Sequence, residues 1–181
     1  MEIKKVSFIG CGALGIMYAS HMMNALPCGQ VQFIVGKDRI DRYKNTEFYA
    51  NGVRQTFEFV AHDADAPPSD LVIFTVKSHG LDDAVRSAKN HIGKNTVILS
   101  FLNGIFSEEV IGKVYNPAKI IPSTVAGMDP VKTGDKVRFT HMGYVAFGGL
   151  PHNDQRDLDA LARFFDQARI RYEVQKDIMI L

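Results

Sequence analysis

Three glycines near the amino terminus constrain the fold more than any other feature of this chain. They occupy positions 10, 12 and 15 in the stretch "FIGCGALGIMYASHM". The preceding run, "KKVSFIG", is rich in β-branched and aromatic residues and is typical of a short buried parallel strand. The following residues, 13–25, carry apolar side chains at helical spacing. Glycine at a junction between strand and helix indicates a tight turn that another group approaches closely.

A second strand is predicted at "VQFIV", residues 31–35. Strand, helix and strand within about 30 residues form a βαβ unit, whose crossover is almost always right-handed. In this context Gly10, Gly12 and Gly15 match the G-x-G-x-x-G fingerprint of the Rossmann dinucleotide-binding fold. The first glycine permits the turn, the second lets a pyrophosphate approach the backbone, and the third lets the helix pack against the strand.

The predicted helix offers phosphates its unpaired N–H groups, including those of Ala13 and Leu14, and the positive end of its dipole. We therefore predict that Gly10, Gly12, Ala13, Leu14 and Gly15 bind the cofactor. The alternative interpretation is a glycine-rich turn that is needed only for packing and binds nothing.

The rest of the chain continues the alternation of strands and helices. The run 47–60 has two β-prone halves about Asn51-Gly52, a dipeptide favoured in tight hairpins. Further strands are predicted at 69–76, 95–101, 118–127, 135–148 (two strands about His141–Gly143) and 170–174, and helices at 78–92, 105–115, 154–168 and from 175 onward. We expect an α/β chain with a Rossmann-like, doubly wound, mainly parallel sheet and a small antiparallel portion.

Composition excludes several functions. The 21 basic and 20 acidic residues are interspersed, which argues against a nucleic acid or membrane-surface partner. No apolar run approaches the roughly 20 residues that span a bilayer. The two cysteines, Cys11 and Cys28, have no metal-ligand spacing and are too few for a disulfide framework. We expect a cytoplasmic protein with no metal site.

The residues after the second strand indicate which dinucleotide binds. A site for NAD needs an acidic residue there to accept hydrogen bonds from the ribose 2′-hydroxyl. This chain has Gly36 at that position, followed by Lys37, Asp38 and Arg39. We predict that Lys37 and Arg39 accommodate a 2′-phosphate, so NADPH is favoured over NADH. The alternative is that both cations begin a solvated helix, with Asp38 as their local counter-charge.

Two more polar residues follow predicted parallel strands. Lys77 comes after the first in "FTVKSHG", and Asn103 comes after the next in "LSFLNGI". Ligands of open α/β folds bind at this edge of the sheet. A lysine ammonium can hold a carboxylate or a ribose, and an asparagine amide can bind a carboxamide or the reacting oxygen. Alternatively, Lys77 starts a helix and Asn103 is a turn residue before Gly104.

Taken in order, "IGCGALG", "TVKSHG", "FLNGI", "SEEV" and the predicted hairpin "MGYVAFGG" resemble the amino-terminal domain of the ketopantoate reductase family. The resemblance implies a Rossmann-type NADP-binding domain over 1–172, with 173–181 beginning the linker helix to a helical carboxy-terminal domain that is absent. It implies NADPH-dependent reduction of 2-dehydropantoate (ketopantoate), a small 2-keto acid, to pantoate, in pantothenate and coenzyme A biosynthesis. It further implies that Lys77 and Asn103 line the catalytic cleft, and that the full-length protein is a homodimer.

The chain departs from the family pattern in two places. Many members have arginine where Gly36 stands. The family's general-acid lysine would lie two or three residues past Leu181, and Lys176, about two helical turns earlier, is not a substitute. We therefore expect the chain to be inactive alone. Two other functions remain open: a related two-domain NAD(P)-dependent hydroxy-acid or glycerol-phosphate dehydrogenase, and a non-catalytic dinucleotide-sensing module.

Overall fold

The computed structural model describes residues 1–102 and 106–176, so Asn103 lies outside the described part, as do residues 177–181 of the helix predicted from 175 onward. Gln175 and Lys176, the first two residues of that predicted helix, are not helical. The first βαβ unit has the predicted boundaries: β1 (Val6–Ile9), α1 (Ala13–Ala25) and β2 (Val31–Val35). Strands β1 and β2 are parallel, with Val6 opposite Val31. The glycine turn therefore lies at the carboxyl end of β1, as the fingerprint requires.

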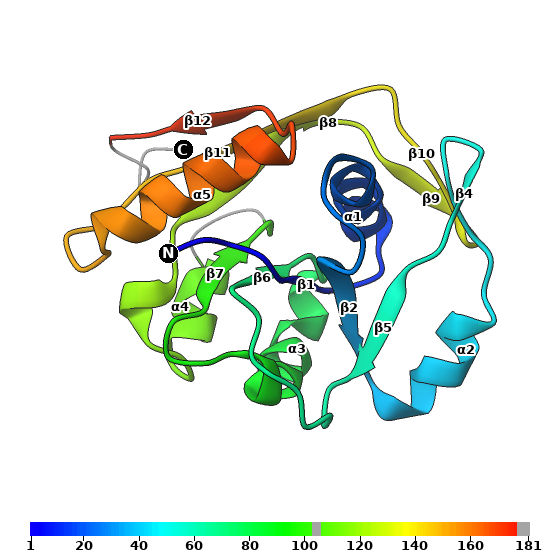
Figure 1. Cartoon of the computed structure of the whole chain (residues 1–181), viewed down its shortest axis with the longest axis horizontal. Helices are drawn as coiled ribbons and strands as arrows, with labels where there is room; N and C mark the ends of the chain where they lie inside the picture. Colours follow the sequence, from blue (N-terminus) through cyan, green and yellow to red (C-terminus); the bar gives the residue numbers. More distant parts are fainter. Residues whose placement is uncertain (103–105, 177–181) are drawn as a thin grey trace.

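The central sheet has five parallel strands in the order β5-β2-β1-β6-β7. The added strands are β5 (Glu58–Ala61), β6 (Leu71–Phe74) and β7 (Val97–Ser100). Helix α1 covers one face, and α3 (Leu81–Ser87) and α4 (Phe106–Gly112) cover the other (Figure 1). Helices on both faces confirm the doubly wound, mainly parallel sheet.

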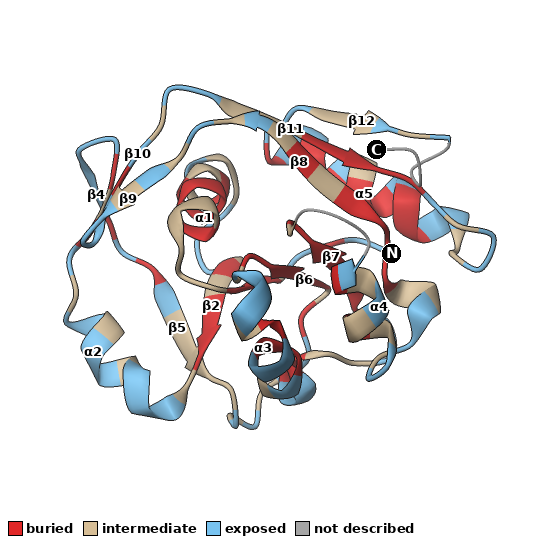
Figure 2. Cartoon of the chain, turned by 180° about the vertical axis from the view of Figure 1, so that it is seen from behind, coloured by how far each residue is buried: buried red, intermediate tan, exposed pale blue. Residues whose placement is uncertain are grey.

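Alternation of side chains along the strands divides the core in two. Val6 and Phe8 of β1 face the cluster that contains α1, whereas Ile9 faces the cluster that contains α3. This follows from the two-residue period of a strand. Because both faces are covered, the three inner strands β1, β6 and β7 are buried throughout and are red in Figure 2, whereas the edge strand β5 is partly exposed.

The predicted hairpin about Asn51-Gly52 is confirmed. Strands β3 (Phe48–Ala50) and β4 (Val53–Gln55) pair in antiparallel fashion, and Asn51 and Gly52 both have positive φ, 48° and 82°. They belong to a second sheet, β4-β3-β10-β9, with β9 (Val131–Thr133) and β10 (Lys136–Arg138). Strand β9 was not predicted, because its three residues are too few to show a period.

A third sheet has the order β12-β11-β8, formed by β8 (Ser123–Met128), β11 (Met142–Phe147) and β12 (Tyr172–Val174). The expected pair of strands about His141–Gly143 exists, but the predicted hairpin is wrong. Strand β10 pairs with β9 and β3, and β11 pairs with β8 and β12. Asp129 explains the break, because its carboxylate accepts hydrogen bonds from the main-chain N–H groups of Thr140 and His141.

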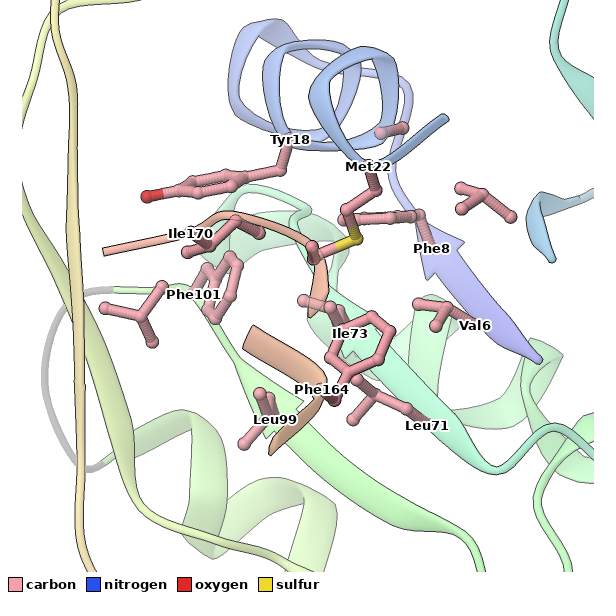
Figure 3. Packing of buried hydrophobic residues seen from close by; sticks show 14 of the residues in the cluster. Val6, Phe8, Tyr18, Met22, Leu71, Ile73, Leu99, Phe101, Phe164 and Ile170 are labelled. Carbon is pink, nitrogen blue, oxygen red and sulfur yellow. The ribbon is translucent and has the colours of Figure 1, made fainter. Parts of the chain in front are cut away.

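Helix α5 (Gln155–Gln167), predicted at 154–168, packs an apolar stripe into the larger core cluster. Leu158, Leu161, Phe164 and Phe165 are all buried. Figure 3 shows Phe164 beside Leu71 and Ile73 of β6, with side chains of α1 reaching the same core. No helix in the described part of the chain is long and apolar enough to cross a membrane.

His91 generates a prediction about stability. Its ring is fully buried, Nε2 lies 2.9 Å from the carbonyl oxygen of Ala61, and Nδ1 has no partner in the structure. Burial lowers the pKa of His91 below its ordinary 6.5. The unfolded chain therefore binds more protons below pH 6.5, so this contribution to stability is fully present above that pH and is lost as the pH falls.

We expect the free energy of unfolding to fall between pH 7 and pH 5, with His91 contributing at most about 1.4 kcal/mol per pH unit. Denaturant unfolding of the H91Q variant should show a shallower pH slope, because glutamine does not titrate. The exposed His152 provides the matched control, and H152Q should keep the wild-type slope. Equal slopes in wild type and H91Q would contradict the assignment.

Candidate functional site

Two of the three glycines are required by packing within the chain. Gly10 has φ of +118°, and a Cβ added there would lie 2.8 Å from the carbonyl carbon of Thr75. A Cβ on Gly15 would overlap the carbonyl oxygen of Gly10 and lie 2.7 Å from Thr75 Oγ1. Larger residues at either position would push β1, α1 and the segment after β6 apart.

Gly12 is different, because nothing in the described part of the chain fills the space beside it. Its φ of −80° suits any residue, and an added Cβ would meet only the Thr75 carbonyl oxygen, at 3.8 Å. Gly12 is the N-cap of α1, and no side chain caps the helix. The first-turn N–H groups, which have no partner within the helix, are therefore available to a ligand. The combination forms a cradle suited to an anion.

Thr75 holds this turn and was missed by the sequence analysis. Its hydroxyl donates to the carbonyl oxygen of Gly10 at 2.9 Å and lies 3.2 Å from that of Ile9, which also accepts from the Thr75 N–H at 2.9 Å. The side chain is buried. The only available signal was its position at the end of an apolar strand, and strand order was needed to place it beside the glycines.

A cleft of about 420 Å³ opens beside the turn, within the range of small-molecule sites. It lies at the carboxyl ends of β1, β2 and β6, between the glycine turn and α3, which is the predicted edge of the sheet. Its walls combine apolar strand ends with polar side chains, which include Asp38, Arg39, His79 and Asp83. His79 is exposed and lines the cleft.

The two predicted phosphate-binding cations lie in different environments. Arg39 lines the cleft, with Nε 3.9 Å from Asp38 Oδ2. Lys37 is not among the lining residues, and its ammonium lies 3.7 Å from Asp63 Oδ2. The Asp38 carboxylate turns back over Gly36, where a Cβ would come within 2.5 Å of it. An acidic and a basic group therefore share this end of the cleft.

Lys77 follows β6 and precedes a short 3₁₀ helix, Ser78–Gly80. Its side chain is exposed and is not part of the cleft lining. Asn103 lies outside the described residues, so the structure does not show whether the two approach each other. The segment before Lys77 is nevertheless next to the glycine turn. Main-chain atoms of Thr75 and Val76 lie 2.8 and 2.9 Å from the point where a Cβ on Gly10 would be.

A buried hydroxyl network joins the segments that flank residue 103. Ser100, at the end of β7, lies 2.8 Å from Ser107 of α4 (Oγ to Oγ), and Ser123 donates to the Ser100 carbonyl oxygen at 3.0 Å. Ser107 also donates to Glu108 at 2.8 Å. Burial raises the pKa of Glu108, although these hydrogen bonds act in the opposite direction. The network fixes β7, α4 and β8 relative to one another.

Cys11 lines the cleft but is not a nucleophile. Burial raises the pKa of its thiol to about 12, although the nearby charges of Lys132 and Arg39 act to lower it. The reactive thiolate is therefore scarce near neutral pH. Within the described residues, no group of three or more His, Cys, Asp or Glu side chains could hold a metal ion.

Comparison with known proteins gives the family. The sequence profile of "Ketopantoate reductase PanE/ApbA" matches residues 6–152, most of the chain. The curated 2-dehydropantoate 2-reductase of Aquifex aeolicus (strain VF5) is 26% identical over 179 residues. The match covers 97% of this chain and 57% of that relative, so the chain spans little more than half of the relative's length.

Solved structures show the same fold. A structure from Enterococcus faecalis, described as a candidate 2-dehydropantoate 2-reductase, superposes with a TM-score of 0.81 at 19% identity, covering 97% of this chain and 58% of that one. D-mandelate dehydrogenase in complex with NADH and anilino(oxo)acetate gives a TM-score of 0.78 at 21% identity, covering 96% and 57%. The glycine turn and the cleft lie at the predicted edge of the sheet, and the family profile matches most of this chain. The chain therefore belongs to the ketopantoate reductase family.

Proposed function

We propose that this chain is the dinucleotide-binding part of an enzyme that reduces 2-dehydropantoate to pantoate with NADPH. The observation that carries the proposal is the space beside Gly12, which residues 1–102 and 106–176 leave empty at the uncapped start of α1. Packing explains Gly10 and Gly15 but not Gly12. A pyrophosphate fits the free N–H groups and the positive helix end, and family membership supports the reaction.

The residues present suit the cofactor. The turn Gly10–Gly12 and the N–H groups of Ala13 and Leu14 would hold the pyrophosphate, and Gly15 would keep α1 against β1. When bound, the nicotinamide supplies a hydride to the keto carbon. The contribution of this chain is to bind and orient the dinucleotide along the carboxyl edge of the sheet, so that its reactive end is held in a fixed direction.

We assign recognition of the 2′-phosphate chiefly to Arg39, because it lines the cleft, with Lys37 adding positive charge from outside it. Asp38 argues for NADH instead, because it lines the same end of the cleft and could accept from a ribose hydroxyl. A fold neighbour, D-mandelate dehydrogenase, is known with NADH. We favour NADPH because two cations, Lys37 and Arg39, flank the single carboxylate of Asp38 after β2.

Lys77 and Asn103 are proposed as residues of the catalytic cleft. Lys77 forms no ion pair within the described residues, so its exposed ammonium is free to meet a substrate carboxylate or a cofactor ribose. The general-acid lysine and a second wall of the cleft would come from beyond residue 181, and a missing acid removes a factor of typically about 10²–10⁴ in rate. We propose that the complete enzyme is a cytoplasmic homodimer with the domain boundary near 172.

The glycines give the first prediction for this function. G12A should keep nearly wild-type stability, within about 1 kcal/mol, because the new methyl group enters open space. It should weaken NADPH binding about tenfold or more, because that space is where the pyrophosphate lies. G15A should instead lower the free energy of unfolding by about 2 kcal/mol, because its methyl group overlaps the Gly10 carbonyl. Denaturant unfolding measures the stability, and titration of NADPH fluorescence measures the affinity. Unchanged NADPH affinity in G12A would contradict the proposal and support a turn that serves packing only.

The cofactor assignment is tested by comparing R39Q with K37Q. We expect R39Q to weaken NADPH binding about tenfold and to leave NADH binding unchanged, because only NADPH carries the 2′-phosphate. K37Q should have a smaller effect, because its ammonium is exposed and lies by Asp63. An unchanged ratio of NADPH to NADH affinity in both variants would reject the phosphate role, and a wild-type preference for NADH would favour the hydroxy-acid dehydrogenase alternative.

Turnover separates the enzyme from the sensor. Residues 1–181 should bind NADPH without oxidising it in the presence of ketopantoate, whereas the natural gene product should turn the substrate over. Absorbance at the NADPH band measures both reactions. Turnover by residues 1–181 alone would disprove the proposal that the general acid lies outside them. If the natural gene product turned over only another 2-keto acid, the reaction class would stand and the proposed substrate would change. Dinucleotide binding without any turnover would support the sensor.

A further inference from the structure

A lysine from the second sheet reaches the phosphate-binding turn. Lys132 lies on β9, and its ammonium donates a hydrogen bond of 2.8 Å to the main-chain carbonyl oxygen of Cys11, 121 residues earlier in the chain. Strands β9 and β10 lie beside α1 (Figure 1). The Lys132 side chain is half-buried, with its ammonium 5.9 Å from the centre of the Phe48 ring.

The sheet directs this side chain toward α1. Lys132 is opposite Val137 in the antiparallel pair of β9 and β10, and directly opposed residues share a face. Val137 is fully buried in the core cluster that includes α1. Lys136, the neighbour of Val137, therefore points to the other face, where it is exposed and its ammonium lies 5.6 Å from the Tyr49 ring centre.

The charge of Lys132 has no carboxylate partner among residues 1–102 and 106–176. The two cations after β2 do have one: Arg39 lies by Asp38, and Lys37 lies by Asp63. The first turn of α1 also contains no acidic residue. A half-buried ammonium and an uncapped helix start thus meet at the same turn, both positive and neither neutralised by the protein.

Cys11 shows that two cations act on this turn. The positive charges of Lys132 and Arg39 both act on its thiol. Arg39 comes from the segment after β2, and Lys132 comes from a different sheet. An anion bound at the turn would accept from the free N–H groups and be attracted by the ammonium, and in the proposed site that anion is the pyrophosphate of the dinucleotide.

We propose that Lys132 is a cofactor-binding residue that holds the phosphate turn through Cys11 and supplies positive charge to the pyrophosphate. The proposal rests on the dinucleotide site proposed above. The second sheet then contributes to cofactor binding, because β9 places this charge at the amino-terminal end of α1. Since NADPH and NADH share the pyrophosphate, Lys132 raises the affinity for both equally.

The test compares the K132M, K132R and K136M variants of the intact protein, with NADPH, NADH and adenosine as probes in calorimetric titrations. We expect K132M to weaken the binding of NADPH and of NADH by the same factor of about ten. The binding of adenosine, which has no phosphate, should stay unchanged. K132R should bind nearly as well as wild type, because it keeps the charge. K136M is the matched control from the opposite face of the same sheet and should bind all three probes normally.

Salt dependence provides a second measurement, because removing a phosphate contact lowers the slope of log Kd against log salt. A smaller slope in K132M than in K136M is expected. Wild-type affinity in K132M would overturn the proposal, as would a loss confined to NADPH, which would place Lys132 at the 2′-phosphate. An equal loss for adenosine would show a structural role alone. If K132M does not fold, K132Q takes its place, and failure of the wild type to bind either dinucleotide would reject the proposed function itself.

Discussion

The arrangement of the site depends on the contact between Thr75 and the turn that follows β1. Thr75 lies at the end of β6, and its hydroxyl and N–H donate to the carbonyl oxygens of Gly10 and Ile9. These bonds join two neighbouring parallel strands where both end, and they leave no room for a side chain on Gly10 or Gly15. These contacts fix the turn against the end of β6, next to the uncapped start of α1.

Three sheets surround α1 and determine what reaches its start. The parallel sheet lies under it, the third sheet receives a hydrogen bond from Tyr18 to the Met142 carbonyl oxygen, and the second sheet brings Lys132 to Cys11. This enclosure explains why seven of the thirteen residues of α1 are buried, rather than a single stripe. The second sheet, although it lies apart from the parallel sheet, thus contacts the glycine turn.

Most of the elements were predictable, because short apolar runs and helical periods are local signals. The hairpin at Asn51-Gly52 and the buried stripe of α5 show such signals clearly. The pairing of β10 and β11 was not predictable, because Asp129 separates them by binding the main chain at Thr140 and His141. The glycine fingerprint located the candidate site, but it could not reveal Thr75 or Lys132, which reach the turn from 65 and 121 residues away.

The sequence by itself determined a Rossmann fingerprint, the order of strands and helices along the chain, and two cations after β2. These are local properties, since they depend on residue type and spacing within a few tens of residues. Only the tertiary structure decided that Gly12 opens onto space that the described residues leave unfilled, that Arg39 rather than Lys37 lines the cleft, and that Asp38 lines it too. Those facts depend on which strands become neighbours, because side chains distant in sequence meet only after the sheets have formed.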